Sequence, residues 1–294
     1  MTTVRSTYVR ASLAAVAAAA VVVISGCGAA RTVSQAIDPV AKAAETTSQV
    51  QGYRMSGVVT IDTGVGPVKT TMSGVMNRVT RTASMITKAT VAGHAVTLSE
   101  RLSGLTVYMD SSAIPGADQL THGKPWLKMD MSRAFTSFGL GSSVSATSSD
   151  PSQFVDYLRA VSDNTKNLGA ATIRGVPTTH YHAVIDLSKY PGVIPAAQRA
   201  TAQRGIKNLE TAIGGHTIPA DVWIDHHKLV RQMSMNMPEC VNNQKVTMSM
   251  TRDMYDYGPQ PATQIPPSAQ TYDLTPLISA SMKQVKLGCS TSSS

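Results

Sequence analysis

Five short segments rich in Val, Thr and Met follow one another in the first half of the chain, at residues 53–62, 67–77, 82–91, 95–102 and 105–110. Tight-turn signals separate them: Gly64 with Gly66, then Ala92-Gly93, then Ser103-Gly104. Short segments of this composition, bounded by glycine turns, are typical of β-strands joined by hairpins. The sequence therefore predicts an antiparallel meander of five strands.

Strand and helix patterns alternate in the remainder of the chain. Further strands are predicted at residues 126–131, 171–174, 178–187, 220–224, 229–237 and 245–255. Helices are predicted at residues 33–49, 151–163 and 195–213, and the chain after Gly258 is rich in proline and is expected to be extended. The fold class is thus α+β, with about eleven strands in one sheet.

The N-terminus has the layout of an export signal. Arg5 and Arg10 precede an uncharged stretch at residues 11–24, which is short of the roughly 20 apolar residues that span a membrane. Ile24, Ser25, Gly26 and Cys27 then fit the bacterial lipobox, in which the cysteine thiol receives a diacylglyceryl group. The alternative is an ordinary secretory signal that contains a cysteine.

A lipobox divides the chain into four parts. Residues 1–26 form the signal peptide, 27–34 a lipidated tether, 35–289 the folded domain and 290–294 a disordered tail. Two lipid chains on Cys27 suffice for stable anchoring, and palmitate is the expected label. The mature protein is expected on the outer face of the cell membrane.

The three cysteines of the chain divide accordingly. With Cys27 lipidated, Cys240 and Cys289 remain as a pair in an oxidising compartment, where a disulfide is expected. It would close a loop of about 50 residues, which the chain-entropy model values at roughly 4 kcal/mol. The alternative is two free thiols.

The chain carries a formal charge of +8, to which Arg5 and Arg10 contribute two. The basic excess suits a surface that meets anionic lipid headgroups or acidic polymers, or it is an ordinary solvated surface. Nucleic acid is not expected as a partner, because the chain is exported and has no recognised binding motif.

No catalytic motif or cofactor fingerprint is present, so no cofactor is expected and the chain is predicted not to be an enzyme. Residues 64–70 (GVGPVKT) have the wrong spacing for a phosphate loop and are interpreted as a hairpin turn. His180 and His182 share a strand face and could chelate zinc, with His226 and His227 at a nearby turn. Because carboxylates are sparse nearby, we interpret these histidines as solvent-facing and predict no metal site.

Methionine is unusually abundant, with 15 Met against 3 Phe and 2 Trp. Many methionines alternate along predicted strands, which places them on one face, whereas Lys128, Asp130, Ser234, Asn236 and Ser249 have the opposite parity. Flexible thioether side chains could adapt to a guest of variable shape. The alternative is that they only pack helices onto the sheet. The candidates for a lipid cavity are Met129, Met131, Val222, Ile224, Met233, Met235, Met248 and Met250.

Four phrases make the chain resemble the LolA-like superfamily, especially lipoproteins of the actinobacterial LppX/LprG type. They are GKPWLKMDMS (123–132), IRGVPTTHYHAVIDLSKY (173–190), IPADVWIDHHKLVRQMSM (218–235) and YDYGPQPATQIPP (255–267). The resemblance implies a curved antiparallel half-barrel whose concave face is covered by helices, with a hydrophobic cavity between. It also implies a lipid or glycolipid ligand and no catalytic residues. The Cys240 and Cys289 pair and the histidines after Asp225 depart from the commoner pattern.

Two functions are therefore weighed. The first is a membrane-anchored envelope lipoprotein that binds lipid, as a carrier or sensor. The alternative is a non-enzymatic envelope regulator or interaction module with a protein partner.

Overall fold

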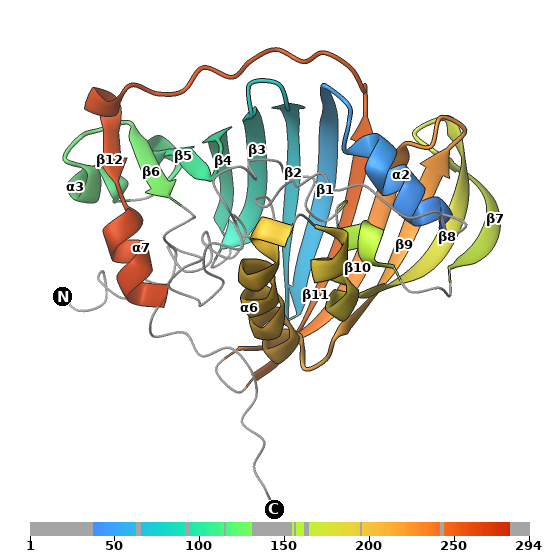
Figure 1. The fold of residues 1–294 in the computed structure, drawn as a ribbon. Helices are drawn as coiled ribbons and strands as arrows, with labels where there is room; N and C mark the ends of the chain where they lie inside the picture. Colours follow the sequence, from blue (N-terminus) through green and yellow to red (C-terminus); the bar gives the residue numbers. More distant parts are fainter. Residues whose placement is uncertain are drawn as a thin grey trace, which may run out of the picture.

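The computed structural model describes residues 38–62, 66–91, 94–114, 116–130, 155, 157–161, 165–194, 196–241 and 244–282. Their strands form one curved sheet in the order β12-β6-β5-β4-β3-β2-β1-β11-β10-β9-β8-β7 (Figure 1). Strands from both halves of the sequence share this sheet. The expected fold class, an α+β half-barrel, is confirmed.

The predicted five-stranded meander and the separately predicted strand at 126–131 together form one wing of the sheet. Its strands are β1 (Gly52–Asp62), β2 (Pro67–Asn77), β3 (Thr82–Val91), β4 (His94–Ser103), β5 (Thr106–Asp110) and β6 (Trp126–Asp130). Each pairs antiparallel with the next, and the bounds lie within one residue of those predicted. Composition and turn signals were enough to define this wing.

The other wing comes from the second half of the chain. It contains β7 (Lys166–Ile173), β8 (Val176–Asp186), β9 (Thr217–Asp225), β10 (Val230–Val241) and β11 (Gln244–Tyr255). Successive strands pair antiparallel, and β11 also pairs with β1, with Met254 opposite Met55. This pairing joins the two wings into one sheet.

The turn between β7 and β8 differs from the expected one. Residues 175–177 were predicted to turn, but Val176 and Pro177 already belong to β8. Arg174 and Gly175 instead have φ angles of 50° and 79°. Two consecutive left-handed residues are typical of the tight type I′ hairpin turn, in which glycine is favoured because it lacks a Cβ.

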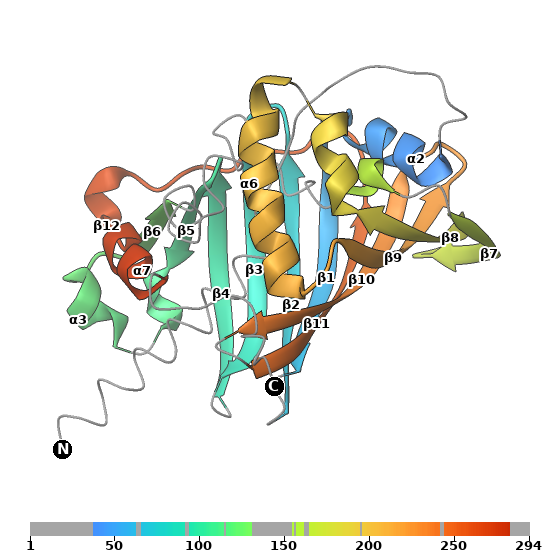
Figure 2. The same cartoon turned by 60° about the horizontal axis from the view of Figure 1, so that its bottom comes forward.

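The longer helices lie on one side of the sheet, and the short helix at residues 117–121 lies beyond the β6 end of the sheet (Figures 1 and 2). The elements are α2 (Pro39–Thr47), η1 (Ser111–Ala113), α3 (Ala117–Thr121), η3 (Leu158–Ala160), η4 (Leu187–Val193), α6 (Ala196–Ile213), η5 (Ser268–Gln270) and α7 (Thr275–Met282). Helix α2 packs against β9 and β10, α6 against β10, and α7 against β6. The main core lies between these helices and the concave face of the sheet.

Two predicted helices have different bounds from those expected. Helix α2 begins at Pro39 rather than residue 33, because the Asp38 carboxylate caps it by accepting hydrogen bonds from the amides of Val40 (2.8 Å) and Ala41 (3.3 Å). The helix predicted at 151–163 ends before Val161, which instead bridges to Ile185. A side-chain cap therefore determines where α2 begins, and a tertiary contact determines where the second helix ends.

An extended strap, residues 256–270, runs along the ends of the meander strands toward β12 (Thr271–Asp273) (Figure 1). Side chains of the wing hold it: Arg101 donates to the Gln264 carbonyl at 3.0 Å, and Thr82 accepts from the Thr263 amide at 3.1 Å. The strap delivers β12 to a parallel pairing with β6, which makes twelve strands instead of eleven.

Candidate functional site

The concave face of the sheet is covered by methionine side chains, and we call this surface the methionine floor. In register, Met235 lies opposite Met250, and Met55 lies opposite Met254. Each of the floor methionines is at most 4% exposed and belongs to the main core cluster. The floor comprises Met55, Met72, Met76, Met85, Met109, Met129, Met233, Met235, Met237, Met250 and Met254.

Most of the candidate cavity residues lie on or beside this floor. Met129, Met233, Met235 and Met250 are members, and Val222 and Ile224 are buried in the same cluster. Met248 is partly buried and packs against it, whereas Met131 lies outside the described residues. That these residues line a lipid cavity stays a prediction.

Residues of the opposite parity are in contact with solvent. Asn236 is exposed, and Lys128, Asp130, Ser234 and Ser249 are half-buried. The Lys128 ammonium lies 3.1 Å from the Asp273 carboxylate at the surface. The alternation of the strands thus separates an apolar face from a polar one.

Seven floor methionines were not among the sequence candidates. The sequence candidates came from runs of methionines spaced two apart, from which Met237 was omitted, whereas Met85 and Met109 stand alone on their strands. The signal that could have identified them is their position along each strand, which is an even number of residues from other apolar residues of the same face. The missed residues are Met55, Met72, Met76, Met85, Met109, Met237 and Met254.

Among the described residues, two buried charged side chains also lie on the concave face. Arg252, between Met250 and Met254 on β11, is 1% exposed, and Glu100, between Leu98 and Leu102 on β4, is 4% exposed. Burial raises the pKa of Glu100 to about 7, although its hydrogen bond from Thr87 acts in the other direction. Neither residue was among the sequence candidates, because a charged residue within a predicted strand is expected to be exposed.

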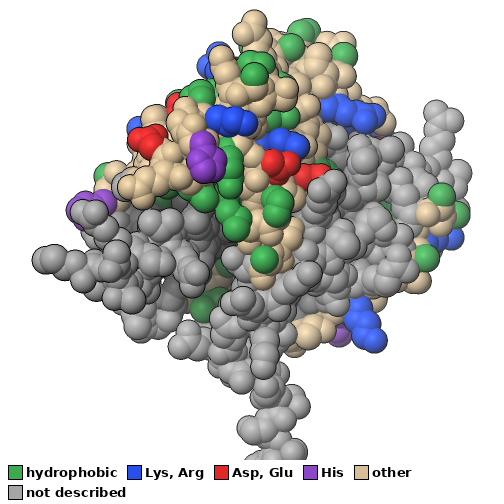
Figure 3. Space-filling model, turned by 90° about the vertical axis from the view of Figure 1, so that its left-hand side faces the viewer, with side chains coloured by type: hydrophobic (Ala, Val, Ile, Leu, Met, Phe, Trp, Pro, Cys, Tyr) green, Lys and Arg blue, Asp and Glu red, His purple; other side chains and the backbone are tan. Residues whose placement is uncertain are grey.

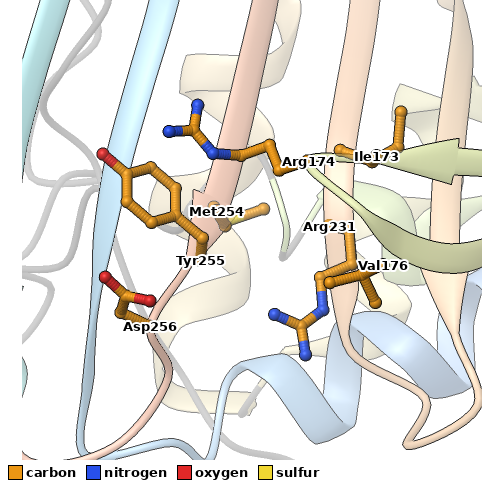
Figure 4. Close-up of a pocket in the computed structure, with 7 residues that line it drawn as sticks. All are labelled: Ile173, Arg174, Val176, Arg231, Met254, Tyr255 and Asp256. Carbon is orange, nitrogen blue, oxygen red and sulfur yellow. The ribbon is translucent and has the colours of Figure 1, made fainter.

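A pocket of about 320 Å³ lies at the β7–β8 turn and is lined by residues that include Arg174, Arg231 and Tyr255 (Figure 4). The Arg174 guanidinium stacks 3.9 Å from the centre of the Tyr255 ring and lies 3.2 Å from the Asp253 carboxylate. Arg231 pairs with the buried Asp225 at 2.6 Å. Both guanidinium groups therefore have carboxylate partners within the protein.

The strand histidines surround one carboxylate on the face opposite the floor. Asp221 Oδ1 lies 3.0 Å from His180 Nε2 and 3.3 Å from His182 Nδ1. The His180 ring stacks on Trp223 with centroids 4.2 Å apart. Among the described residues, no group of three His, Cys, Asp or Glu side chains is placed to hold a metal ion. These histidines make polar contacts on the sheet surface.

Basic side chains are dispersed on the face that carries α3 and β12. In the described part of this face, Lys and Arg stand apart from one another and are mixed with carboxylates (Figure 3). This distribution resembles an ordinary solvated surface more than a concentrated basic patch.

Several candidate residues fall outside the part of the chain that the structure describes. Cys27, the residues of the signal peptide and Cys289 are among them, and so is the side chain of Cys240. Lipidation and the disulfide therefore stay predictions. Within the described ranges, no helix has the length and hydropathy needed to cross a bilayer.

Comparisons with protein-family models and with curated proteins find no match. Among solved structures, the chain is similar to lipoprotein LppX of Mycobacterium tuberculosis, with 15% identity and a TM-score of 0.44, over 76% of this chain and 95% of that one. It is similar to LprF of Mycobacterium bovis, with 13% identity and a TM-score of 0.42, over 78% and 95% of the two chains. A LolA superfamily protein of Nitrosomonas europaea matches with 9% identity and a TM-score of 0.25, over 80% and 96%.

Proposed function

We propose that the protein binds lipid between the methionine floor and the helices that cover it, as an anchored carrier or sensor of the cell envelope. The observation that carries this proposal is the floor itself. Eleven of the fifteen methionines of the chain gather on one concave face, contributed by seven strands.

Methionine distinguishes this face from an ordinary sheet core. A core of fixed shape is best built from branched and aromatic side chains with few rotamers, whereas methionine is unbranched and adapts to irregular neighbours. Acyl chains vary in length and bend, so an adaptable wall suits them. Each methylene that such a chain buries contributes about 0.8 kcal/mol.

The N-terminal sequence supports the same function. A diacylglyceryl group on Cys27 would keep the domain close to a membrane surface, where its ligand resides. The short stretch from Cys27 to Asp38, where the described fold begins, limits how far the domain can move from that surface.

The first test is extraction of bound material. The domain without its lipid anchor is purified and extracted with organic solvent, and the extract is examined by mass spectrometry. An acylated species in stoichiometric amount supports the proposal. A lipid-free protein that captures an envelope protein would contradict it and favour the alternative of an interaction module.

A second test uses two pairs of adjacent residues on the same two strands. Met235 and Met250 lie opposite each other on the floor, and Asn236 and Ser249 lie opposite each other on the other face. Changing both methionines to Asp should abolish binding of a fluorescent fatty acid, because a carboxylate in an apolar site must stay unpaired or take up a proton. Changing Asn236 and Ser249 to Asp should leave binding nearly intact.

Circular dichroism confirms that each variant folds. If the double Asp variant does not fold, Met250→Gln replaces it, with a several-fold loss of affinity expected. If both double Asp variants fold and bind the fatty acid equally well, the methionines only fill the core and do not form a lipid-binding surface.

A further inference from the structure

Glu100 is a carboxyl group set among thioethers. Its cross-strand partners are Met85 on β3 and Met109 on β5, both buried on the floor. Leu98 and Leu102 flank it along β4 and face the same way. Glu100 is only 4% exposed, so its side chain has little contact with bulk water.

Thr87 is the partner of this carboxyl. Its hydroxyl donates a 3.0 Å hydrogen bond to Oε2 of Glu100, and Thr87 is itself 3% exposed. Within the part of the chain that the structure describes, Oε1 receives no hydrogen bond. A carboxyl group has room for several, so this pair retains unused hydrogen-bonding capacity.

The cationic group of the floor is far from this pair. Arg252 lies on β11, and β1, β2 and β3 stand between β11 and β4. At about 4.8 Å per strand spacing, the two positions are roughly 19 Å apart along the sheet. Arg252 is therefore too far away to form an ion pair with Glu100. A carboxyl group with one hydrogen bond among thioether and leucine side chains is unusual in a core, so its presence calls for an explanation.

We propose that Glu100 and Thr87 recognise a hydroxyl group of the bound lipid, such as the free hydroxyl of a diacylglycerol. This inference rests on the proposed lipid-binding function and specifies the class of lipid. A hydroxyl group suits the site in both protonation states: it donates to a carboxylate and accepts from a carboxylic acid.

Charged headgroups suit the site less well. A phosphate or a carboxylate would face the like charge of ionised Glu100, and both charges would be desolvated. An ammonium group would require Glu100 to stay ionised in surroundings that favour its neutral form. A neutral lipid with one free hydroxyl avoids both costs.

The test compares two lipids that differ at one oxygen. A pyrene-labelled 1,2-diacylglycerol and its 3-O-methyl ether are titrated into the anchor-free protein. The wild type should bind the hydroxyl form about tenfold more tightly, as expected when a hydrogen bond to a buried polar partner is lost. Glu100→Met replaces the carboxyl group with another methionine side chain, so this variant should bind both lipids with similar affinity. Glu100→Gln, which keeps hydrogen-bonding atoms, should retain most of the preference.

Ser99→Ala is the matched control, because Ser99 adjoins Glu100 on β4 but is exposed on the opposite face of the sheet, outside the methionine floor. It should keep the preference for the hydroxyl form. The inference is overturned if the wild type binds both lipids equally, or if Glu100→Met keeps the tenfold preference. Failure of folded wild type to bind either lipid would instead overturn the proposed function. If Glu100→Met does not fold, the relative affinity of the wild type for the two lipids still tests the inference.

Discussion

Arg231 and Asp225 are joined by two guanidinium nitrogens, Nε and Nη2, that each lie 2.6 Å from the same carboxylate oxygen. The Asp225 side chain is fully buried, and its other oxygen accepts the Leu229 amide at 2.9 Å. The Arg231 guanidinium also lies over the Tyr257 ring, 4.9 Å from its centre. The Asp225–Arg231 pair thus connects the β9–β10 turn to the start of the strap.

Asp225→Ala is therefore expected to be strongly destabilising. Removing one partner of a buried ion pair leaves the other charge uncompensated, at a cost of about 3 to 5 kcal/mol. Urea denaturation followed by circular dichroism measures the loss. Asp221→Ala is the control, because Asp221 is 38% exposed and its contacts with His180 and His182 lie at the surface. A loss near 1 kcal/mol or less is expected there, and equal losses would contradict the assignment.

Glu100 should make stability depend on pH. Its pKa is raised from 4.5 to about 7, so the folded protein holds this proton more tightly than the unfolded chain does. Stability from this group is fully present below pH 4.5, falls as the pH rises toward 7, and is constant above that. The total loss is about 3 kcal/mol.

Glu100→Gln removes this titration. The difference in unfolding free energy between the variant and the wild type should shift in favour of the variant by about 3 kcal/mol between pH 4.5 and 7.5. Urea melts at several pH values measure it. A difference that stays constant across this range would mean that Glu100 titrates normally.

Cys27→Ala should abolish lipidation and release the protein from the membrane. The expectation follows from the lipobox Ile24-Ser25-Gly26-Cys27, since the alanine variant has no thiol to carry the diacylglyceryl group. Incorporation of labelled palmitate and fractionation of cells measure the two effects. Cys240→Ala should remain labelled and membrane-bound. Label on the Cys27→Ala protein would show that another residue is modified.

Cys240 and Cys289 should form a disulfide in the mature protein, with a gain of roughly 4 kcal/mol from loop closure. Thiol titration of the unfolded, non-reduced Cys27→Ala protein should detect no free thiol, and reduction should reveal two. Two free thiols before reduction would refute the pairing.

Most strands could be predicted from the sequence because they have one buried and one solvated face. The bounds of β2 and β3 agree with the prediction because turn residues flank both segments and Val, Thr and Met are frequent within them. For β7, only residues 171–174 were predicted, since most side chains of Lys166–Ile173 are exposed and no alternation appears. Short elements such as β12 and α7 have too few residues to show a period, and tertiary contacts determine them.

The floor could be predicted only in part for a related reason. Parity identifies a methionine as inward-facing when its strand carries a second one, as in Met233 and Met235. Glu100 has the same parity as Leu98 and Leu102, but a carboxyl group is expected in water unless the structure shows otherwise. Sequence patterns thus predict part of the methionine floor, whereas only the folded structure shows that the Glu100 carboxyl group lies on it.

The central strand pairing, β1 with β11, joins segments from opposite ends of the domain, so the order of synthesis matters for folding. Until Tyr255 has been made, β1 and β10 each lack a neighbour. Contacts so distant in sequence form slowly, and unpaired strands of this kind associate with other chains. A chain truncated before Gln244 should therefore aggregate even though every strand of its meander is complete.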